Sequence, residues 1–404
     1  MYATKTVRKF LEKKLPFIHK RRLESLFFAV NALIAGGRLS LSGLGRGARG
    51  YVAPKHNIKR VDRLLGNSHL AQELMKIFEA ITKHLLQGKT QPLILIDQTQ
   101  LDEEFSSLSA AVPLDGRAIP IYWEAHPNKK TKNRKVQEDF LVTLQRLVPE
   151  NSKPIIVTDA GFQNPWFDAV SRLGWNYVGR LSGWVRIRIQ EEDWRLAPNF
   201  YAIAKKENTD LGLCGVAKKA EALHRVVLGK KFVRNAKRTP AKRRRCDRGR
   251  GNAQAKQRSQ EPWLIATSLN TVSANQIMKI YAQRMQIEEN YRDLKNHRFG
   301  WSFSHAKSKN PKRFLVLLLI ASIANIALTI LGQAAESAGI HFGYQANTVR
   351  SRRVLSLFFL AKKIVARDDL KWCKKAHIKA AFCTVKVKIL SLPTGNNELF
   401  VGFP

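Results

Sequence analysis

One long apolar run, at residues 314–331, strongly limits the folds that this chain can adopt. A run of this length is near the lower limit of about 18–20 residues for a membrane-spanning helix. It contains Ser322, Asn325 and Thr329, and it stands alone in a very basic chain. We therefore expect a helix buried in the core of a large domain rather than a membrane span.

The chain is strongly basic, with 70 Lys and Arg residues against 31 Asp and Glu and a net charge of +39. Such an excess over 404 residues indicates a polyanionic partner, most often nucleic acid. It argues against a site for small acidic metabolites, which need only a few cations. The four cysteines form no C-x-x-C pair, and the basic N-terminus lacks the apolar segment of a secretory signal. We therefore expect a protein of the reducing cytoplasm.

The N-terminal region, residues 1–90, has apolar residues at helical spacing. Gly45, Gly47 and Gly50 match the letters of a dinucleotide-binding fingerprint, but no βαβ pattern surrounds them, which argues against nucleotide binding. We expect a flexible cationic loop there, leading into a basic helix. One face of that helix is cationic and suits DNA phosphates, and it is formed by Lys55, His56, Lys59, Arg60 and Arg63. The alternative is that this face is only solvated.

From residue 91 the pattern changes to strands alternating with helices, which is typical of an α/β domain. Two apolar strands are expected to end at Asp97 and Asp159. The other expected elements are strands at 105–113 and 117–125 joined by a turn at Asp115–Gly116, helices at 135–148 and 165–173, and a strand at 177–181.

Residues 184–270 are expected to be rich in strands and enclose a basic segment at 230–258. This segment carries 13 Lys or Arg residues and one acid, Asp247. Its low apolar content predicts a mobile loop in the free protein. We expect the loop to hold DNA non-specifically, the alternative being a solvated loop without a role in binding.

Two aspartates, Asp97 and Asp159, each end an apolar strand. In open α/β sheets, ligands bind beyond the carboxyl ends of strands, so these two carboxylates can converge and hold a divalent cation. Two such ions suit an in-line displacement at phosphorus. The alternative is that each aspartate only caps the turn that follows its strand.

A third acid, Glu288, lies in a segment at 274–297 that is expected to be one continuous helix. At about 100° per residue, Tyr281, Arg284, Glu288 and Lys295 fall within a stripe roughly 60° wide, with Met285 near the same face. A helix face with a phenol, a guanidinium, a carboxylate and an ammonium group is too polar to pack in a core, and it suits contact with DNA phosphates. Glu288 would then complete a site of three carboxylates.

The pattern Y-x2-R-x3-E-x6-K, together with the two strand-end aspartates, resembles the signature of bacterial cut-and-paste DDE transposases of insertion sequences. The likeness extends over nearly the whole chain. The matching stretches are 55–67, the TDAGF motif at 158–162 with Pro165–Trp166, and 261–267, 284–295 and 344–350. A departure lies directly after the first aspartate, where Gln98 stands in place of a tryptophan.

The resemblance implies an RNase H-like catalytic core with a mixed sheet, interrupted by a β-rich insertion. It implies a helical DNA-end-binding region at 1–90, a core at 91–183 and 271–335, an insertion at 184–270, and a C-terminal region at 336–404 for DNA contact or dimerisation. Asp97, Asp159 and Glu288 would be catalytic and would hold two Mg²⁺ ions, for which Mn²⁺ can substitute.

The resemblance also implies a homodimer that cuts paired inverted-repeat ends in trans, through a hairpin, and joins the 3′-hydroxyls to target DNA. Tyr281, Arg284 and Lys295 would contact DNA. Trp263 would stack on a displaced base and Met285 would wedge into the duplex. A core tryptophan beside a strand is the alternative for Trp263. No Walker A run occurs, so no nucleotide cofactor is expected.

Two other functions stay open on the sequence. An RNase H-like nuclease or resolvase would share the carboxylates without needing the stripe from Tyr281 to Lys295. The second alternative is a transposase-derived protein that binds DNA without cutting it. The three intact acids argue against this alternative. A terminal inverted repeat flanking the coding region would favour the transposase.

Overall fold

The computed structural model describes residues 1–205, 207–218, 222–230, 261–303, 306, 308, 310–346 and 348–392. The chain forms two compact units. The first unit combines Met1–Pro154 with Gln283–Pro404, and the second is Ile155–Ala282. Each unit is described by itself below.

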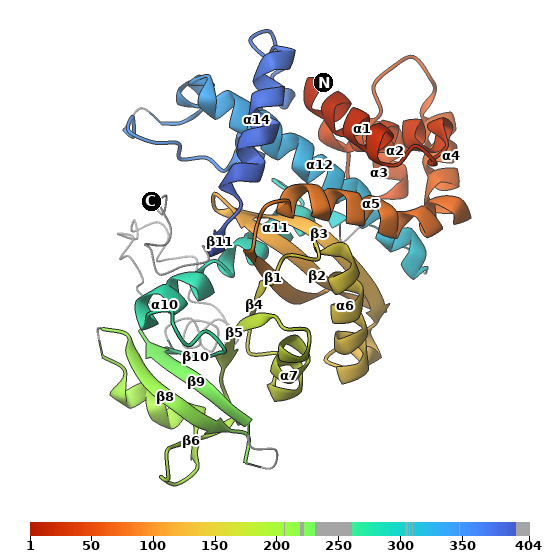
Figure 1. The fold of residues 1–404 in the computed structure, drawn as a ribbon. Helices are drawn as coiled ribbons and strands as arrows, with labels where there is room; N and C mark the ends of the chain where they lie inside the picture. The colour runs from red at the N-terminus through yellow and green to blue at the C-terminus, as the bar shows by residue number, and fades with distance from the viewer. Residues whose placement is uncertain are drawn as a thin grey trace, which may run out of the picture. The chain divides into compact units, whose positions relative to one another are not determined.

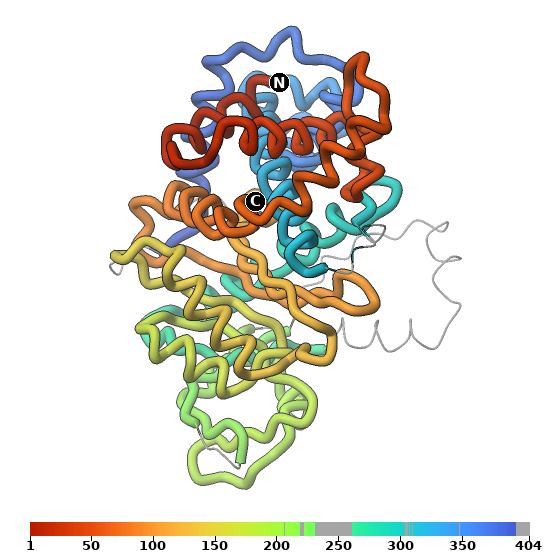
Figure 2. Tube along the Cα trace, turned by 90° about the vertical axis from the view of Figure 1, so that its right-hand side faces the viewer, coloured from red at the N-terminus to blue at the C-terminus, as the bar shows by residue number. Residues whose placement is uncertain are grey.

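The first unit places helices from both ends of the chain around a small sheet (Figures 1 and 2). The N-terminal helices are α1 (Tyr2–Lys14), α2 (Lys20–Ile34), α3 (Leu41–Gly47), α4 (Pro54–Leu65) and α5 (Ser68–Leu86). They are followed by β1 (Gln91–Gln100), β2 (Phe105–Leu114), β3 (Arg117–Pro127), the 3-10 helix η1 (Asn128–Lys130) and α6 (Arg134–Leu147). The C-terminal part adds α11 (Met285–Lys295), α12 (Pro311–Ser337), the 3-10 helix η4 (Ile340–Tyr344), α13 (Leu357–Ala366), α14 (Lys375–Lys388) and β11 (Ser391–Leu392).

Helix α12 contains the long apolar run and forms the centre of the first unit. It packs against α1, α2, α5, α13, α14 and β3, so it is covered on all sides. Among the residues that the structure describes, α12 is the one helix that is long and apolar enough to cross a membrane. Of its most apolar stretch of 18 residues, 94% is buried inside the protein. An all-round apolar helix is expected in such a position, which confirms the prediction of a core helix.

The three polar residues within the apolar run of α12, Ser322, Asn325 and Thr329, are hydrogen-bonded inside the core. Ser322 Oγ accepts a hydrogen bond from Trp123 Nε1 on β3 at 3.0 Å. Asn325 Nδ2 donates to Asn290 Oδ1 on α11 at 3.1 Å, and Thr329 Oγ1 donates to Asn325 Oδ1 at 3.4 Å. Buried polar groups without such partners would be costly, so these bonds fix the rotation of α12 against β3 and α11.

The sheet of the first unit is an antiparallel meander in the order β3–β2–β1, and β11 pairs with the start of β1. The turn between β2 and β3 has positive φ at both central residues, 48° at Asp115 and 85° at Gly116. This is the tight hairpin turn that an Asp-Gly pair favours, and it confirms the predicted hairpin. The β1–β2 register places Asp97 opposite Ser109.

The expected flexible loop before the basic helix is wrong in part, because residues 41–47 form α3. A Cβ on Gly45 would lie 2.6 Å from Ile58 Cα, and one on Gly47 would lie 2.7 Å from Gly37 Cα. These two glycines therefore allow helix backbones to approach closely, which explains the G-x-G-x-x-G letters without a nucleotide. Gly50 has a φ of 131°, which favours glycine.

The second unit is rich in strands, as the sequence predicts. Its strand order is β4 (Ile155–Thr158), β5 (Asn176–Leu181), β10 (Trp263–Thr267), β9 (Ala222–Gly229), β8 (Thr209–Val216), β6 (Arg186–Ile189) and β7 (Arg195–Leu196). The β4–β5 pair is parallel and the other pairs are antiparallel. The unit also contains α7 (Asn164–Arg172), the 3-10 helix η2 (Ala197–Ile203) and α10 (Ala274–Ala282). Apart from Lys230, the basic segment 230–258 lies outside the described residues.

The fold class is confirmed as mixed α/β, with helical regions at both ends of the chain. The arrangement is consistent with an RNase H-like core. The prediction of one continuous helix at 274–297 is wrong, since the segment forms two helices, α10 and α11.

Candidate active site

Asp97 lies near the carboxyl end of β1, after a run of fully buried aliphatic residues. Its exposed fraction is 9%, which is low for a carboxylate. Its Oδ1 atom accepts a hydrogen bond from the backbone N–H of Gln98 at 2.8 Å. This bond holds the side chain in one orientation. Gln98, the residue that departs from the transposase pattern, lies with its Nε2 atom 2.7 Å from His126 Nε2.

The break between α10 and α11 separates Tyr281 from the rest of the predicted stripe. The N–H groups of Gln286 and Ile287 donate to the carbonyls of Gln283 and Arg284, three residues back, at 2.9 and 3.1 Å. A 3-10 turn therefore interrupts the α-helical geometry on which the stripe depended. Tyr281 is only 3% exposed and belongs to the second unit, where its ring packs edge-on against Trp263 at 4.8 Å.

Arg284, directly before α11, lies between two of the predicted carboxylates. Its Nη1 atom is 3.6 Å from Asp97 Oδ2, and its Nη2 atom donates to Glu288 Oε1. The Arg284 side chain is 13% exposed and that of Glu288 is 41% exposed. The structure thus brings Asp97, Arg284 and Glu288 together, with a cation between two anions.

Helix α11 is held across the sheet by bonds from its other residues. Tyr291 donates its hydroxyl to the backbone carbonyl of Asp97 at 3.1 Å and lies 2.5 Å from Ser109 Oγ. The Lys295 ammonium donates to Thr99 Oγ1 at 2.6 Å. Burial lowers the pKa of Lys295, while the charge of Asp97 opposes that shift.

Our reasoning from the sequence missed Tyr291, which fixes α11 against the strand that carries Asp97. Its spacing held the signal, because Tyr291 follows Glu288 by three residues and precedes Lys295 by four. Residues at these spacings lie on one face of a helix. A second anchor that we missed is Arg117 on β3, whose Nε atom donates to Asp293 Oδ2 on α11 at 2.6 Å.

Asp159 belongs to the second unit and follows the last residue of β4. Its Oδ1 atom accepts a hydrogen bond from the backbone N–H of Gly161 at 2.9 Å. Both strand-end aspartates therefore have one carboxylate oxygen held by a nearby backbone N–H. The turn-capping interpretation describes this bond correctly, but the bond occupies only one oxygen of each side chain.

Residues 96–325, more than half of the chain, match the family described as the transposase DDE domain. The chain belongs to this family. The matched range contains Asp97, Asp159 and Glu288 together with Arg284, Lys295 and the second unit. Comparison with curated proteins gives no match.

DDE transposases generally use divalent metal ions, and the chemistry of this donor set suits them. Carboxylate oxygens are the ligands that Mg²⁺ prefers. Among the residues that the structure describes, no group of three or more His, Cys, Asp or Glu side chains is arranged to hold a metal ion. Asp97 and Glu288 already neutralise a cation, the guanidinium of Arg284. They fit a metal ion in charge and in donor type.

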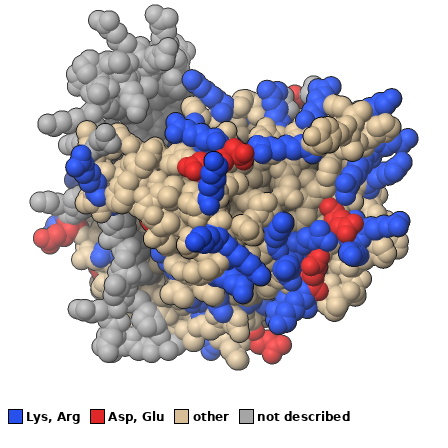
Figure 3. Space-filling view, turned by 90° about the horizontal axis from the view of Figure 1, so that it is seen from above, with Lys and Arg blue, Asp and Glu red and all other residues tan. Residues whose placement is uncertain are grey.

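The basic helix α4 presents the predicted cationic residues to solvent. Val61, Leu64 and Leu65 are buried, and the predicted DNA-facing side chains are exposed, namely Lys55, His56, Lys59, Arg60 and Arg63. Lys and Arg side chains far outnumber Asp and Glu on the face of the molecule in Figure 3. This charge suits the DNA binding that membership of the transposase family implies.

The remaining predicted DNA contacts lie on different units. Met285 begins α11 in the first unit and is 37% exposed. Trp263 begins β10 in the second unit and is partly buried against Tyr281.

The second unit also contains a hollow of about 840 Å³ beside Asp159, which our reasoning from the sequence missed. It is lined by residues that follow Asp159 and by the loop after β5. Trp184, on that loop, is 89% exposed. The cationic residues around the hollow are Arg180, Arg186 and Lys218, and Arg180 pairs with Glu261 at 3.1 Å.

Proposed function

We propose that this chain is a cut-and-paste DNA transposase that excises an insertion sequence at its inverted-repeat ends. Hydrolysis would free a 3′-hydroxyl at each end. That hydroxyl would attack the opposite strand to form a hairpin, water would reopen the hairpin, and the 3′-hydroxyl would join target DNA. The main support is the transposase DDE match over residues 96–325, which contains all three predicted acids.

Asp97, Asp159 and Glu288 would hold two Mg²⁺ ions, and Mn²⁺ would substitute. Metal ions in such a site would activate the attacking oxygen and stabilise the leaving oxygen of an in-line displacement. The backbone bonds to Asp97 and Asp159 support this role, because they orient each carboxylate before a ligand arrives.

Arg284 and Lys295 would position the phosphates of the strand that is cut. Arg284 would exchange its carboxylate partners for a DNA phosphate, since guanidinium groups bind phosphate well. Trp263 would stack on a displaced base and Met285, already partly exposed, would enter the base stack. Tyr281 would act through its ring contact with Trp263 rather than touch DNA itself.

Binding and assembly would involve the other regions. Residues 1–90 would bind the transposon end, and residues 336–404 would contact DNA or a second copy in a homodimeric synaptic complex. The core would comprise 91–183 and 271–335, and the insertion 184–270 would include the basic loop 230–258. The protein would act in the bacterial cytoplasm, associated with the nucleoid, without a nucleotide cofactor or a membrane partner.

The finer resemblance supports the hairpin route. The Y-x2-R-x3-E-x6-K pattern formed by Tyr281, Arg284, Glu288 and Lys295 is typical of one group of these enzymes. The stretches at 55–67, 284–295 and 344–350 resemble the transposase of the insertion sequence that flanks the composite tetracycline-resistance transposon.

A cleavage assay on DNA that carries the element's own terminal repeat tests this function. Wild type and Asp159→Ala would be compared on a denaturing gel, with Mg²⁺ and with chelator. We expect a metal-dependent nick followed by a hairpin band, both absent in the variant. Nicks without hairpins or joined products would favour a nuclease or resolvase. Binding without cleavage under any metal would favour a catalytically silent DNA-binding protein.

A further inference from the structure

We propose that a hollow between α2 and α4 is a phosphate clamp for the DNA backbone, formed by Arg21 and Ser25 of α2 with Arg60 and Arg63 of α4. This inference rests on the proposed function, because DNA is the ligand. It adds α2 to the DNA-binding surface that the sequence predicted on α4, and it places one phosphodiester group of the DNA in the hollow between the two helices.

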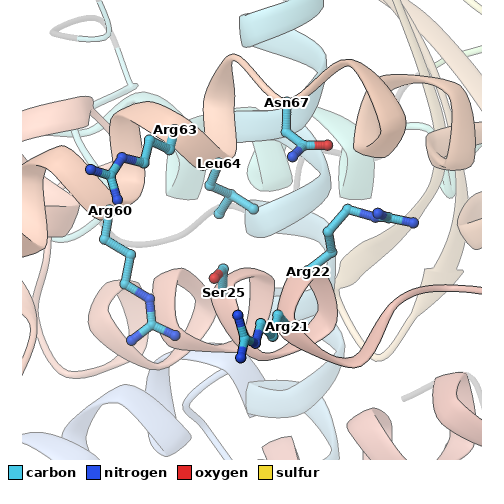
Figure 4. Close-up of a pocket in the computed structure, with 7 residues that line it drawn as sticks. All are labelled: Arg21, Arg22, Ser25, Arg60, Arg63, Leu64 and Asn67. Carbon is cyan, nitrogen blue, oxygen red and sulfur yellow. The ribbon is translucent and has the colours of Figure 1, made fainter.

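The hollow has a volume of about 530 Å³ and is open to solvent. Four arginines line it together with Ser25, Leu64 and Asn67, and no acidic residue takes part. Figure 4 shows the two helices on opposite sides, with Arg60 reaching from α4 toward α2. A space of this size exceeds what one phosphate fills, so a phosphodiester and its attached sugars can enter.

The four arginines differ in how their charges are balanced. Arg22 is neutralised by Glu73 on α5, with its Nε atom donating to Glu73 Oε2 at 3.0 Å. The guanidinium of Arg60 lies 4.2 Å from the ring centre of Phe28 on α2. Within the described part of the chain, Arg21 and Arg63 have no carboxylate within ion-pair distance. Three cationic groups therefore face one hollow without an anion to balance them.

Neutral donors complete the lining of the hollow. Ser25 has a hydroxyl, and Asn67 is the N-cap of α5, where its Oδ1 atom accepts the backbone N–H of Leu70 at 2.8 Å. Guanidinium groups, a hydroxyl and a side-chain amide can all donate hydrogen bonds to phosphate oxygens.

The frame around the clamp is fixed by interactions that do not involve its own side chains. The Arg22–Glu73 pair ties α2 to α5. Arg313 on α12 donates to Asp62 on α4 at 2.6 Å. The close approach at Gly45 packs α3 against α4. The helices that carry the clamp residues are therefore fixed in place before DNA binds, which lowers the entropy cost of binding.

The position of the clamp on α4 favours DNA over a small free anion. Lys55, His56 and Lys59 continue the cationic face toward the amino end of the same helix. At about 1.5 Å per residue, the face from Lys55 to Arg63 is roughly 12 Å long, whereas the phosphates of one DNA strand follow one another at about 3.4 Å along the helix axis. The face can therefore contact several phosphates of one strand, of which the clamp receives one, whereas a small free anion would occupy the hollow alone.

The test measures DNA binding by the full-length protein against salt concentration. The double variant Arg21→Gln/Arg63→Gln is compared with wild type and with Arg146→Gln/Lys153→Gln, which removes two exposed charges elsewhere in the first unit. We expect the slope of log affinity against log salt to become shallower by about 1 in the clamp variant, because one phosphate contact is lost. The control variant should keep the wild-type slope.

A second measurement locates the phosphate. Single methylphosphonate substitutions neutralise each phosphate in turn, on a duplex with the terminal repeat and on an unrelated duplex. Wild type and control should lose affinity at several phosphates of the terminal repeat, and the clamp variant should lose the sensitivity at one of these while it keeps the others. Equal slopes and equal sensitivity in the clamp variant, with unchanged circular dichroism, would overturn the inference.

Two further outcomes separate this inference from the proposed function. If wild type binds DNA through the clamp but never nicks it, the clamp stands and the transposase activity fails. If inorganic phosphate binds the hollow while DNA affinity is the same in wild type and clamp variant, the hollow is a site for free anions and the inference fails.

Discussion

Arg284 Nη1 lies 3.6 Å from Asp97 Oδ2, while the same guanidinium pairs with Glu288. The two carboxylates proposed to bind metal therefore share an internal cation. A metal ion and this guanidinium would compete for the same oxygens. A DNA phosphate offers Arg284 another partner, so DNA binding and metal binding are expected to favour one another.

This relationship predicts the metal affinity of the DNA-free protein. Arg284→Gln should bind Mn²⁺ at least about tenfold more tightly than wild type, since the competing charge is removed. Electron paramagnetic resonance of free Mn²⁺ measures this affinity without any cleavage. Arg292→Gln, on the exposed side of the same helix, should behave as wild type. Equal affinities in Arg284→Gln and wild type would show that the guanidinium does not compete.

Removal of one carboxylate should separate chemistry from binding. Glu288→Gln should lower the nicking rate by at least about 100-fold, because even residues that only orient metal ligands typically cost 10–100-fold. Binding of terminal-repeat DNA should change little, since phosphate contacts supply most of the affinity. Single-turnover cleavage and a gel-shift assay measure the two effects. Nicking at the wild-type rate would remove Glu288 from the catalytic set.

Trp263 should matter at the hairpin step more than at the first nick. Trp263→Ala removes the proposed stacking surface, whereas Trp263→Phe retains an aromatic ring for both the base and Tyr281. Base stacking on an aromatic side chain contributes about 1–3 kcal/mol, so hairpin formation should slow by about 5- to 150-fold in the alanine variant. A time course that resolves nicked and hairpin products provides the measurement. Equal slowing of both steps would indicate a purely structural tryptophan.

Gly45 should be essential for packing of the DNA-binding helices. In Gly45→Ala the new Cβ would meet the Ile58 backbone at 2.6 Å, so α3 and α4 must separate. Such overpacking typically costs about 1–3 kcal/mol in the free energy of unfolding. Gly343→Ala is the matched control, because nothing lies within 4 Å of its new Cβ. Urea denaturation compares the two variants, and equal midpoints would contradict the close helix contact.

His224 should make the stability of the second unit depend on pH. Burial lowers the pKa of His224, opposed by the charge of Asp168, and its Nδ1 atom lies 2.5 Å from the Tyr177 hydroxyl. The unfolded chain therefore takes up this proton first as the pH falls below about 6.5, and the folded state loses stability. Above that pH the ring of His224 is neutral in both the folded and the unfolded state, so it no longer makes the stability depend on pH.

His224→Gln, which keeps a hydrogen-bonding group, should weaken this dependence. Urea midpoints at about pH 7.5 and 5.5 bracket the ordinary pKa of histidine. The difference between the two midpoints should be smaller in the variant than in wild type. Burial also lowers the pKa values of His84 and His126, so some dependence on pH should remain. An unchanged difference would show that His224 does not contribute.

The local pattern of the chain was enough to predict many elements. The Asp115–Gly116 hairpin follows from turn chemistry between two apolar strands, and the helix at 134–147 follows from apolar spacing. The positions of Asp97 and Asp159 at strand ends were also predictable, because each carboxylate directly follows or ends an apolar run. The sequence could not show that Arg284 pairs with Asp97, since the two residues are far apart in the chain and only folding brings them together.

The sequence by itself determined the charge, the α/β class, the three acids and the buried nature of the run at 314–331. These depend on composition and on short-range periodicity, which the chain carries in every conformation. Tertiary structure alone decided the approach of Arg284 to Asp97, the burial of Tyr281 against Trp263, and the position of Arg21 and Arg63 in the lining of one hollow. Each of these depends on contacts between segments that the folded chain brings together, and no local pattern specifies such contacts.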